Sequence, residues 1–379
     1  AIRQAMKIMG HQYVMGRNIR EALDRSMQKK NQIYRHSFDM LGEAALTTDD
    51  AARYLDSYRD AISAIGSRAS SDSIYEAPSI SVKLSALHPR FEQSHHHVVV
   101  PEVAARVLDL AQLAMANQIA LTIDTEESER LMLSVDVFST VLKDPSLKGW
   151  NGLGLAMQTY QKRGFALVDY LVELSRSTGQ RIPIRLVKGA YWDAEIKHAQ
   201  VEGYTGYPVF TRKASTDVSF IACSRKVLAN RQAFYPQFAT HNAHTIAVIT
   251  ELAGNRLDFE FQRLHGMGED LYGVVMSEEG FRHACRVYAP VGSHEDLLPY
   301  LVRRLLENGA NTSFVNRIVD EKLPVEKVAE DPIEKVEGYD PLPHPAIPLP
   351  RHMYGSQRLN SLGVNLDSEW EVVRLAGLM

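Results

Sequence analysis

The sequence predicts an α/β protein folded as an eight-stranded (βα)8 barrel of the TIM type. From about residue 35 onward, short runs of β-branched and apolar residues recur, and stretches long enough for a helix separate most of them. Strands that alternate with helices form parallel sheets, and eight such units fit the length of a barrel domain. Polar residues also gather at the carboxyl ends of these strands, the face where barrels carry their chemistry. An open doubly wound sheet is the alternative, but no Gly-x-Gly-x-x-Gly sequence follows a predicted strand.

The composition is that of an ordinary globular protein, with 45% hydrophobic and 23% charged residues in a chain of 379. The formal net charge is −4, so no broad basic field exists to hold nucleic acid. Cys223 and Cys285 are too few for a disulfide framework, which fits a reducing cytosol, and they lack the spacing of a zinc site. No apolar run is long enough to predict a membrane span.

Residues 1–33 are predicted to form an N-terminal helical arm. Apolar side chains recur mostly at three- and four-residue spacing over residues 2–29, which is the pattern of an amphipathic helix. The chain starts at Ala1 without an initiator methionine, and its first residues read like the middle of a helix. We therefore expect the chain to be a piece of a longer protein.

The barrel itself is assigned to residues 34–317. Its strands are recognised as short β-branched or apolar runs, with enough chain after most of them for a crossover helix. The predicted strands cover residues 37–41, 79–84, 120–124, 153–158, 182–187, 237–240, 259–262 and 286–290.

The helical stretch 300–309 follows the eighth strand and carries two adjacent arginines. Tyr300, Arg303, Arg304 and Glu307 fall on one stripe of this helix, and leucines and a valine fall on the opposite side. Guanidinium groups grip a carboxylate through two parallel hydrogen bonds, so the stripe suits a small anion. The alternative is a charged helix face that water simply solvates.

Residues 318–379 are predicted to be a tail outside the barrel. The segment 340–350 holds five prolines in eleven residues, which excludes a helix or a central strand and favours an extended spacer. Residues 362–379 have some helical pattern but cannot bury much surface alone.

Three charged residues lie inside or at the end of predicted strands. Lys83, Asp124 and Arg185 each follow apolar neighbours, and a charge in such surroundings is costly unless it is paired. Their mixed signs at one end of one barrel predict a shared polar site, with three separate rim charges as the alternative. The polar residues at this end are Glu43, Lys83, Asp124, Gln158, Arg185, Lys188, Thr240, His241, Gln262 and Tyr288.

The loop after the fifth strand has features of a nucleotide-binding loop. Gly189 allows close approach of a ligand to the backbone, Lys188 adds positive charge, and Trp192 offers a stacking surface. His241 and His244 invite a metal interpretation, but no third ligand is evident, so hydrogen bonding to a cofactor is the preferred interpretation and no metal site is predicted.

Four long segments resemble the proline dehydrogenase family, more narrowly the proline dehydrogenase region of bacterial proline utilization A proteins. They are residues 81–89 (SVKLSALHP), 185–192 (RLVKGAYW), 236–242 (PQFATHN) and 300–312 (YLVRRLLENGANT). The resemblance implies a distorted barrel whose last helix lies across the carboxyl ends of the strands. It implies FAD as a noncovalent cofactor, and oxidation of L-proline to Δ1-pyrroline-5-carboxylate by hydride transfer to flavin N5, the first step of proline catabolism.

The same resemblance implies partners and a location. Electrons would pass to a membrane quinone, and the protein would work in the cytoplasm, peripherally associated with the inner membrane. The tail would lead toward an aldehyde dehydrogenase module in the same parent chain.

The resemblance also implies roles for individual residues. Arg303 and Arg304 would hold the proline carboxylate, with Lys83 as a third cation; Asp124 and Glu307 would hold these cations, and Arg185 would lie near flavin N5. The residues implied for catalysis are Lys83, Asp124, Arg185, Tyr288, Arg303, Arg304 and Glu307. Those implied for the substrate are Lys83, Tyr191, Leu264, Tyr288, Tyr300, Arg303 and Arg304. Those implied for the cofactor are Gln158, Arg185, Val187, Lys188, Gly189, Ala190, Trp192, Thr211, Lys213, Thr240, His241, Asn242 and Gln262.

Two alternatives to a proline dehydrogenase are open. A flavoenzyme acting on a related cyclic amino acid such as 4-hydroxyproline is one, although the bulk of Tyr288 would crowd a ring hydroxyl. A catalytically inactive scaffold is the other, although it would not need all of the charges at Lys83, Asp124, Arg185, Arg303 and Arg304.

Overall fold

The protein is described by a computed structural model over residues 10, 12–277, 282–293, 298, 300–304 and 330–378. Within these residues the sheet is a closed barrel in the order β1 to β8, and every neighbouring pair is parallel. The predicted (βα)8 fold is therefore confirmed. The strands are β1 (Arg35–Met40), β2 (Ser79–Lys83), β3 (Ala120–Asp124), β4 (Leu153–Gln158), β5 (Ile182–Val187), β6 (Phe234–Ala239), β7 (Glu260–Leu264) and β8 (Ala284–Val291).

Every predicted strand is present, and the boundaries differ most at β6. Strand β6 begins at Phe234 and contains Pro236, which pairs with Ile184 of β5. Because proline lacks the N–H that a strand ladder uses, the sequence pattern favoured a start after it. Here the register of the neighbouring strands outweighs that local signal.

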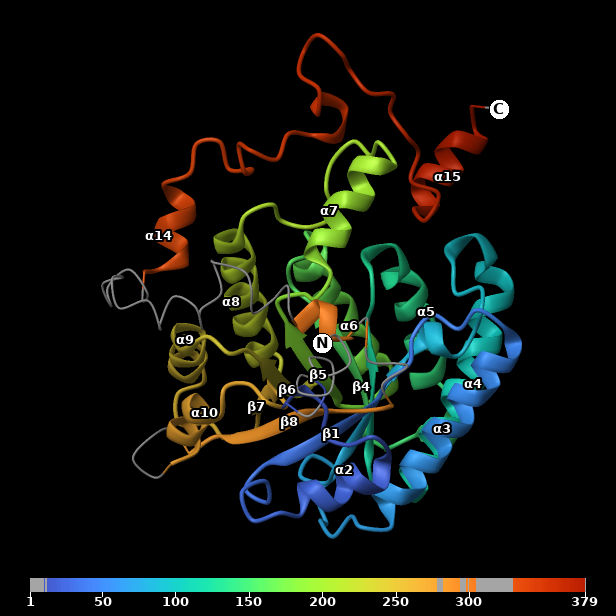
Figure 1. Ribbon diagram of the computed structural model, residues 1–379, viewed down its shortest axis with the longest axis vertical. Coiled ribbons are helices and arrows are strands. Elements are labelled where there is room, and N and C mark those ends of the chain that lie inside the picture. Colours follow the sequence, from blue (N-terminus) through green and yellow to red (C-terminus); the bar gives the residue numbers. More distant parts are fainter. Residues whose placement is uncertain are drawn as a thin grey trace, which may run out of the picture.

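Helices surround the barrel, with α3 to α5 on one side and α8 to α10 on the other (Figure 1). Around the barrel they are α2 (Ile19–Ser26), α3 (Thr48–Gly66), α4 (His96–Ala116), α5 (Leu131–Leu142), α6 (Gly164–Thr178), α7 (Trp192–Val201), α8 (Lys213–Ala229), α9 (Ala243–Ala253) and α10 (Glu269–Met276). In the tail they are α14 (Pro332–Glu337) and α15 (Glu369–Ala376). Among the described helices, none has the length and apolar character needed to cross a bilayer.

The hydrophobic core lies between the strands and the helices. Successive side chains of a strand point to opposite faces, and the outward ones are apolar and fully buried, as at Phe38, Ile80 and Phe261. The inward ones are largely polar. Arg185 on β5 donates across the barrel to the hydroxyls of Ser37 on β1 (3.2 Å) and Ser81 on β2 (3.1 Å), so these groups fill the interior.

The N-terminal arm is not one continuous helix, contrary to the prediction. In its described part the chain leaves helical geometry around residues 14–18, where Gly16 forms a bridge with Val291 of β8 and Asn18 caps α2. A Cβ at position 16 would lie 2.5 Å from the backbone nitrogen of Ala22, so only glycine fits there. Pairing with the barrel edge therefore overrides an amphipathic pattern that ran through this turn.

The helix after β8 lies over the carboxyl ends of the strands, as predicted. Residues 298 and 300–304 are helical, and their orange segment crosses in front of the strands in Figure 1. Tyr300 and Leu301 are buried against Val14 and Leu41, the residue that follows β1. Glu307 and the rest of the predicted helix lie outside the described residues.

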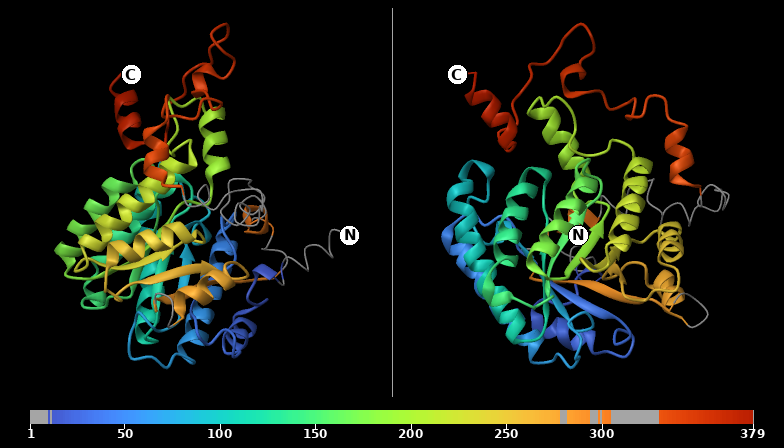
Figure 2. Two further views of the ribbon diagram at one scale, coloured as in Figure 1. Left: turned by 90° about the vertical axis from the view of Figure 1, so that its left-hand side faces the viewer. Right: turned by 180° about the vertical axis from the view of Figure 1, so that it is seen from behind.

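The proline-rich segment of the tail contains no α-helix or strand, as predicted, and only its last residue, Pro350, begins a short 3-10 turn; the tail is nevertheless bound to the barrel. Both turned views in Figure 2 show it arching beyond α7. The Tyr207 hydroxyl donates to the Pro348 carbonyl (2.7 Å), and Arg212 Nε donates to the Leu342 carbonyl (3.0 Å). Ile347 packs into a small apolar cluster beside α7 that includes Tyr207. The segment is therefore a strap on the barrel surface.

Candidate active site

Lys83, at the end of β2, is held by a carboxylate from the neighbouring strand. Its ammonium lies 2.7 Å from Asp39 Oδ1 of β1, 3.4 Å from the Tyr288 hydroxyl, and 4.0 Å from Asp124 Oδ2. Burial alone would lower the pKa of Lys83, but Asp39, Tyr288 and Asp124 raise it well above its ordinary value. Lys83 is therefore a fixed buried cation, and its direct partner is Asp39 rather than Asp124.

Asp124 joins two other predicted site residues. Arg185 Nη1 donates to its Oδ1 at 2.5 Å, and the Tyr288 hydroxyl donates to its Oδ2 at 2.7 Å. The Arg185 guanidinium also lies 5.2 Å from the centre of the Tyr288 ring. Lys83, Asp124 and Arg185 thus share one polar site, as their positions in the sequence predicted.

Arg303 on the last helix makes a bidentate ion pair with Glu43, which lies after β1. Its two terminal nitrogens are 2.7 and 3.0 Å from the two carboxylate oxygens, in the parallel geometry typical of arginine and a carboxylate. Burial alone would raise the pKa of Glu43, but Arg303 and, more weakly, Lys83 lower it below its usual value. Arg303 and Lys83 therefore both lie close enough to Glu43, at the mouth of the barrel, to stabilise its charge.

Aromatic rings accompany these cations. The Arg303 guanidinium lies 5.2 Å from the centre of the Tyr191 ring, and the Arg304 guanidinium lies 5.2 Å from that of Tyr300. Arg304 is 8% exposed, so the arginine stripe is not a solvated face. Leu264 ends β7, and its backbone N–H donates to His241 Nε2 at 3.1 Å. That bond occupies one ring nitrogen of His241, which argues against the metal alternative.

The residues predicted for the cofactor follow strands β4 to β7. Gln158 at the end of β4 donates to the Glu126 carbonyl (2.6 Å) and accepts from the Ala190 N–H (3.1 Å). This single side chain therefore ties the loop after β3 to the loop after β5. Gly189 in that second loop has a φ of 148°, which a residue with a side chain rarely adopts.

Two lysines converge on one carboxylate beside this loop. Lys188 Nζ lies 2.5 Å from Asp217 Oδ1, and Lys213 Nζ lies 2.7 Å from Oδ2 of the same residue. Burial lowers the pKa of Lys188, and Asp217 opposes that effect. Two ammonium groups against one carboxylate leave an excess of positive charge, which suits a phosphate group.

Other predicted cofactor residues hold the loops in place. The Trp192 indole N–H donates to the Phe210 carbonyl (2.8 Å), and Thr211 Oγ1 accepts from the His344 N–H of the strap (3.0 Å). Thr240 Oγ1 accepts from the Asn242 N–H (3.1 Å), and Asn242 caps α9. Val187 accepts from the Thr159 backbone N–H through its carbonyl.

Sequence reasoning missed three carboxylates that organise this site. Asp39 is buried inside β1, and the rule that a charge in a strand needs a partner would have found it. Glu126 accepts hydrogen bonds from the Ser85 N–H (3.1 Å) and hydroxyl (2.5 Å), and burial raises its pKa to about 7. Glu260 is buried in β7, where alternation with two phenylalanines marks it as inward-facing.

The family model described as proline dehydrogenase matches residues 22–317. This chain belongs to the proline dehydrogenase family. It is 51% identical to the bifunctional protein PutA of Salmonella typhimurium over 387 residues, covering 99% of this chain and 29% of that protein. It is 31% identical to proline dehydrogenase 2 of Bacillus subtilis over 209 residues, covering 54% of this chain and 59% of that protein.

Solved structures of related proteins share the fold. A structure of proline utilization A with proline bound in remote sites is 50% identical, covers 99% of this chain and 38% of its own, and superposes with a TM-score of 0.92. Proline utilization A from Bdellovibrio bacteriovorus, inactivated by N-propargylglycine, is 25% identical with a TM-score of 0.89, covering 100% of this chain and 40% of its own. The chain therefore spans well under half the length of these larger proteins.

The residues predicted for the site divide into two sets around the barrel mouth. The residues assigned to substrate come mainly from β8, β2 and the last helix, with Tyr191 and Leu264 as exceptions. The residues assigned to cofactor come from β4 to β7 and the loops after them. Asp124 of β3 accepts hydrogen bonds from Arg185 of the second set and from the Tyr288 hydroxyl of the first, so it joins the two sets.

Proposed function

We propose that this chain is a flavin-dependent proline dehydrogenase that oxidises L-proline to Δ1-pyrroline-5-carboxylate with FAD as its cofactor. The observation that carries the proposal is the meeting of the two residue sets at Asp124, which bonds both Arg185 and Tyr288, within a chain whose family is known. The first set contains the fixed cations Lys83 and Arg303, which suit a carboxylate. The second contains the positively charged loop at Lys188, which suits a phosphate-bearing cofactor. Proline oxidation needs both next to each other.

The cations would hold the substrate carboxylate. Arg303 is already bound to a carboxylate, that of Glu43, in the bidentate geometry that we propose for proline. Arg304 and Lys83 would add positive charge near the same carboxylate. A carboxylate held at one end of a five-membered ring fixes the direction in which the ring carbon beside nitrogen points.

The aromatic side chains would form the walls of the pocket. Tyr288 is fixed through its hydroxyl to Asp124, and Tyr191 is stacked against Arg303. Leu264 and Tyr300 would complete the apolar surface. Because the position of Tyr288 is fixed at both its ring and its hydroxyl, a hydroxylated ring would be accommodated poorly, which favours proline over 4-hydroxyproline.

The cofactor set has the chemistry that FAD requires. The excess of ammonium groups at Lys188 and Lys213 suits a pyrophosphate, and Gln158, His241 and Gln262 can bond to polar ring or ribityl atoms. When bound, FAD supplies a hydride acceptor at flavin N5. Arg185 would place positive charge beside it, which stabilises the added electrons. The surrounding cations would also lower the pKa of the substrate amine, so that its proton passes to water.

The remaining parts of the proposal concern the parent protein. We propose that the electrons pass to a membrane quinone, that the protein works in the cytoplasm in peripheral contact with the inner membrane, and that an aldehyde dehydrogenase module shares its chain. The domain limits of 1–33, 34–317 and 318–379 remain predictions, as do the individual site roles, including that of Glu307.

The test is the visible absorption of the purified chain after loading with FAD under anaerobic conditions. We expect a bound-flavin band that bleaches on addition of L-proline and stays unchanged with 4-hydroxyproline at the same concentration. Bleaching by 4-hydroxyproline alone would favour the related cyclic amino acid. Failure to retain FAD, or a band that neither compound bleaches, would contradict the proposal.

A further inference from the structure

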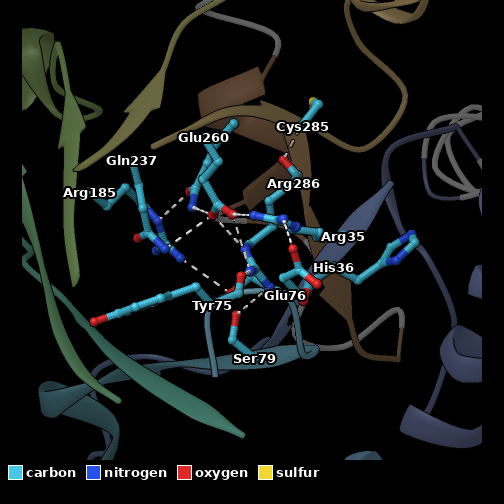
Figure 3. A network of polar contacts seen from close by, with 12 residues as sticks. Arg35, His36, Tyr75, Glu76, Ser79, Arg185, Gln237, Glu260, Cys285 and Arg286 are labelled. Atoms are coloured by element: carbon cyan, nitrogen blue, oxygen red, sulfur yellow. Dashed lines mark hydrogen bonds and ion pairs between the residues drawn. The ribbon is translucent and has the colours of Figure 1, made fainter. Parts of the chain in front are cut away.

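A buried carboxylate lies deeper in the barrel than any residue assigned to the site. Glu260, the first residue of β7, is 0% exposed and receives hydrogen bonds from several strands (Figure 3). Arg286 Nε lies 2.6 Å and Arg35 Nη1 lies 3.1 Å from its oxygens, and the side-chain amide of Gln237 donates at 3.1 Å. Burial alone would raise the pKa of Glu260, but Arg286 and Arg35 lower it, so the group is an ionised acceptor.

Gln262 connects this carboxylate to the site. It lies two residues farther along β7, on the same inward face, and its Nε2 donates to Glu260 Oε1 at 2.9 Å. Its Oε1 accepts from Arg185 Nε at 2.7 Å. An ionised carboxylate can only accept and a guanidinium can only donate, so a single orientation of the amide satisfies both neighbours. Glu260 thereby determines which end of Gln262 faces Arg185.

Arg185 passes the constraint to the mouth of the barrel. Its Nε is held by Gln262, while Nη1 is held by Asp124 and Nη2 by two serine hydroxyls. A planar guanidinium bonded along both edges has its plane fixed. Asp124 in turn accepts from the Tyr288 hydroxyl. A continuous series of bonds therefore runs from Glu260 to Tyr288.

Glu260 makes one contact, with Gln262, that neutralisation of the two arginines does not require. Arg286 and Arg35 have further partners of their own, since Arg286 donates to the His36 carbonyl (3.1 Å) and Arg35 donates to Glu76 (2.9 Å). The bond from Gln262 adds nothing to the neutralisation of either arginine. It does leave the amide oxygen pointing toward Arg185.

We propose that Glu260 is a positioning residue for the active site, which sets the Gln262 amide and, through it, the plane of the Arg185 guanidinium. The inference rests on the proposed function for the identity of the group that Arg185 serves, the flavin. The substrate cations are not part of this series, because Lys83 is held by Asp39 and Arg303 by Glu43. Tyr288 is the last member of the series and the only one assigned to the substrate, so disturbing Glu260 should affect the flavin and the rate of its reduction more than it affects proline binding.

The main test is Glu260→Asp, which keeps a negative charge near the two arginines but draws the carboxylate back by one methylene, away from Gln262. We expect a shifted flavin midpoint potential and a kcat lowered about tenfold or more, since small misplacements at a reacting centre are costly. The KM for proline should stay within about twofold of the wild type. The matched control is Glu76→Asp, the same change at the 59% exposed partner of Arg35; it should leave potential, kcat and KM unchanged.

A second variant keeps the proposal decidable if Glu260→Asp fails to fold. Gln262→Met leaves the Glu260 ion pairs intact and cuts the series, so it should shift the potential and lower kcat in the same direction. Where both single variants fold, adding Glu260→Asp to Gln262→Met should produce no further change. Additive effects, or folded variants with the wild-type potential and kcat, would overturn the proposal.

A measurement without flavin separates this proposal from the proposed function. In the apoprotein, the NMR signal of the Arg185 Nε–H should be protected from exchange in the wild type and in Glu76→Asp, and should exchange faster in Glu260→Asp. If the wild type shows no flavin bleaching yet this pattern appears, the function is wrong while the positioning stands. If proline bleaches the flavin and the Arg185 signal is the same in all three proteins, the positioning alone is wrong.

Discussion

At the scale of residues, the site is organised by two ion pairs whose acids come from the same stretch of chain. Asp39 near the end of β1 holds Lys83, and Glu43 four residues later holds Arg303. Each cation is buried or half-buried, so its position is set before any ligand arrives. Burial of a charge is costly, and an immediate carboxylate partner offsets that cost. Acids in and just after β1 thus determine where positive charge lies at the mouth of the barrel.

The importance of Arg303 can be tested by Arg303→Met, which keeps much of the side-chain volume and removes the charge. We expect the KM for proline to rise by about tenfold or more, because losing one partner of a desolvated charge pair costs about 2–5 kcal/mol. Steady-state kinetics of FAD-loaded protein would measure it. Arg53→Met is the control, since Arg53 is 60% exposed and pairs with Asp50 on α3. An unchanged KM in Arg303→Met would mean that this arginine does not bind substrate.

At the scale of elements, the loops after β3, β4 and β5 form one connected surface. Gln158 bridges the first and third of these loops. In the third loop, Gly189 permits the turn between Lys188 and Trp192. A Cβ on Gly189 would lie 2.4 Å from the Tyr160 ring, so the turn depends on glycine both for its backbone angle and for space. The strand supplies a rigid base and the loop supplies the chemistry.

Gly189→Ala should weaken FAD binding more than it weakens the fold. The added methyl group meets Tyr160, and the loop must shift to relieve the contact, which displaces Lys188 and Trp192. We expect about a tenfold loss of FAD affinity, measured by titration of the apoprotein, since a strained backbone angle costs about 1–3 kcal/mol.

The matched control for this loop is Gly179→Ala. Gly179 also has a left-handed φ, of 71°, but it ends α6 and has nothing within 4 Å of its added Cβ. It should lower the melting temperature and leave FAD affinity unchanged. An equal loss of FAD affinity in the two variants would show that Gly189 matters only for general stability.

At the scale of the whole molecule, the barrel reverses the usual distribution of polarity in its interior. Apolar side chains pack outward against the helices. Charged groups fill the inside, from Glu260 at the start of β7 to Lys83 at the end of β2. Most of these charges are paired, so the interior contributes specificity more than net stability. The strap of the tail adds a further layer beside α7, joined through Tyr207 and Arg212.

This polar interior makes stability depend on pH through Glu126. The folded protein raises the pKa of Glu126 from 4.5 to about 7, so its stabilising contribution is complete below pH 4.5 and is lost as pH rises through 7. The total is about 3 kcal/mol, at about 1.4 kcal/mol for each unit of pKa. Glu126→Gln mimics the protonated form, so its advantage in melting temperature over the wild type should be small at pH 5 and largest at pH 8.

Thermal unfolding of both proteins from pH 5 to 8 would measure this difference. A pH-independent difference for Glu126→Gln would contradict the assigned burial effect.

The sequence by itself determined the architecture of the barrel and much of the residue content of its site. Strand and helix periodicity are local, so all eight strands could be recognised, and a charge among apolar neighbours marked Lys83, Asp124 and Arg185. The arm was predicted wrongly because its pattern continued through Gly16, and only pairing with Val291 of β8 shows why the helix breaks there.

Tertiary structure alone decided which of these residues are partners. Lys83 and Asp124 are directly paired in the strand register, yet the Lys83 ammonium turns to Asp39 and leaves Asp124 to Arg185. Closure of the barrel brings β5 opposite β1, so that Arg185 reaches Ser37, and contact across the interior between β7 and β5 joins Glu260, Gln262 and Arg185 in a continuous series. Side-chain pairing in the interior depends on distances across the barrel, and local sequence periodicity contains no information about those distances.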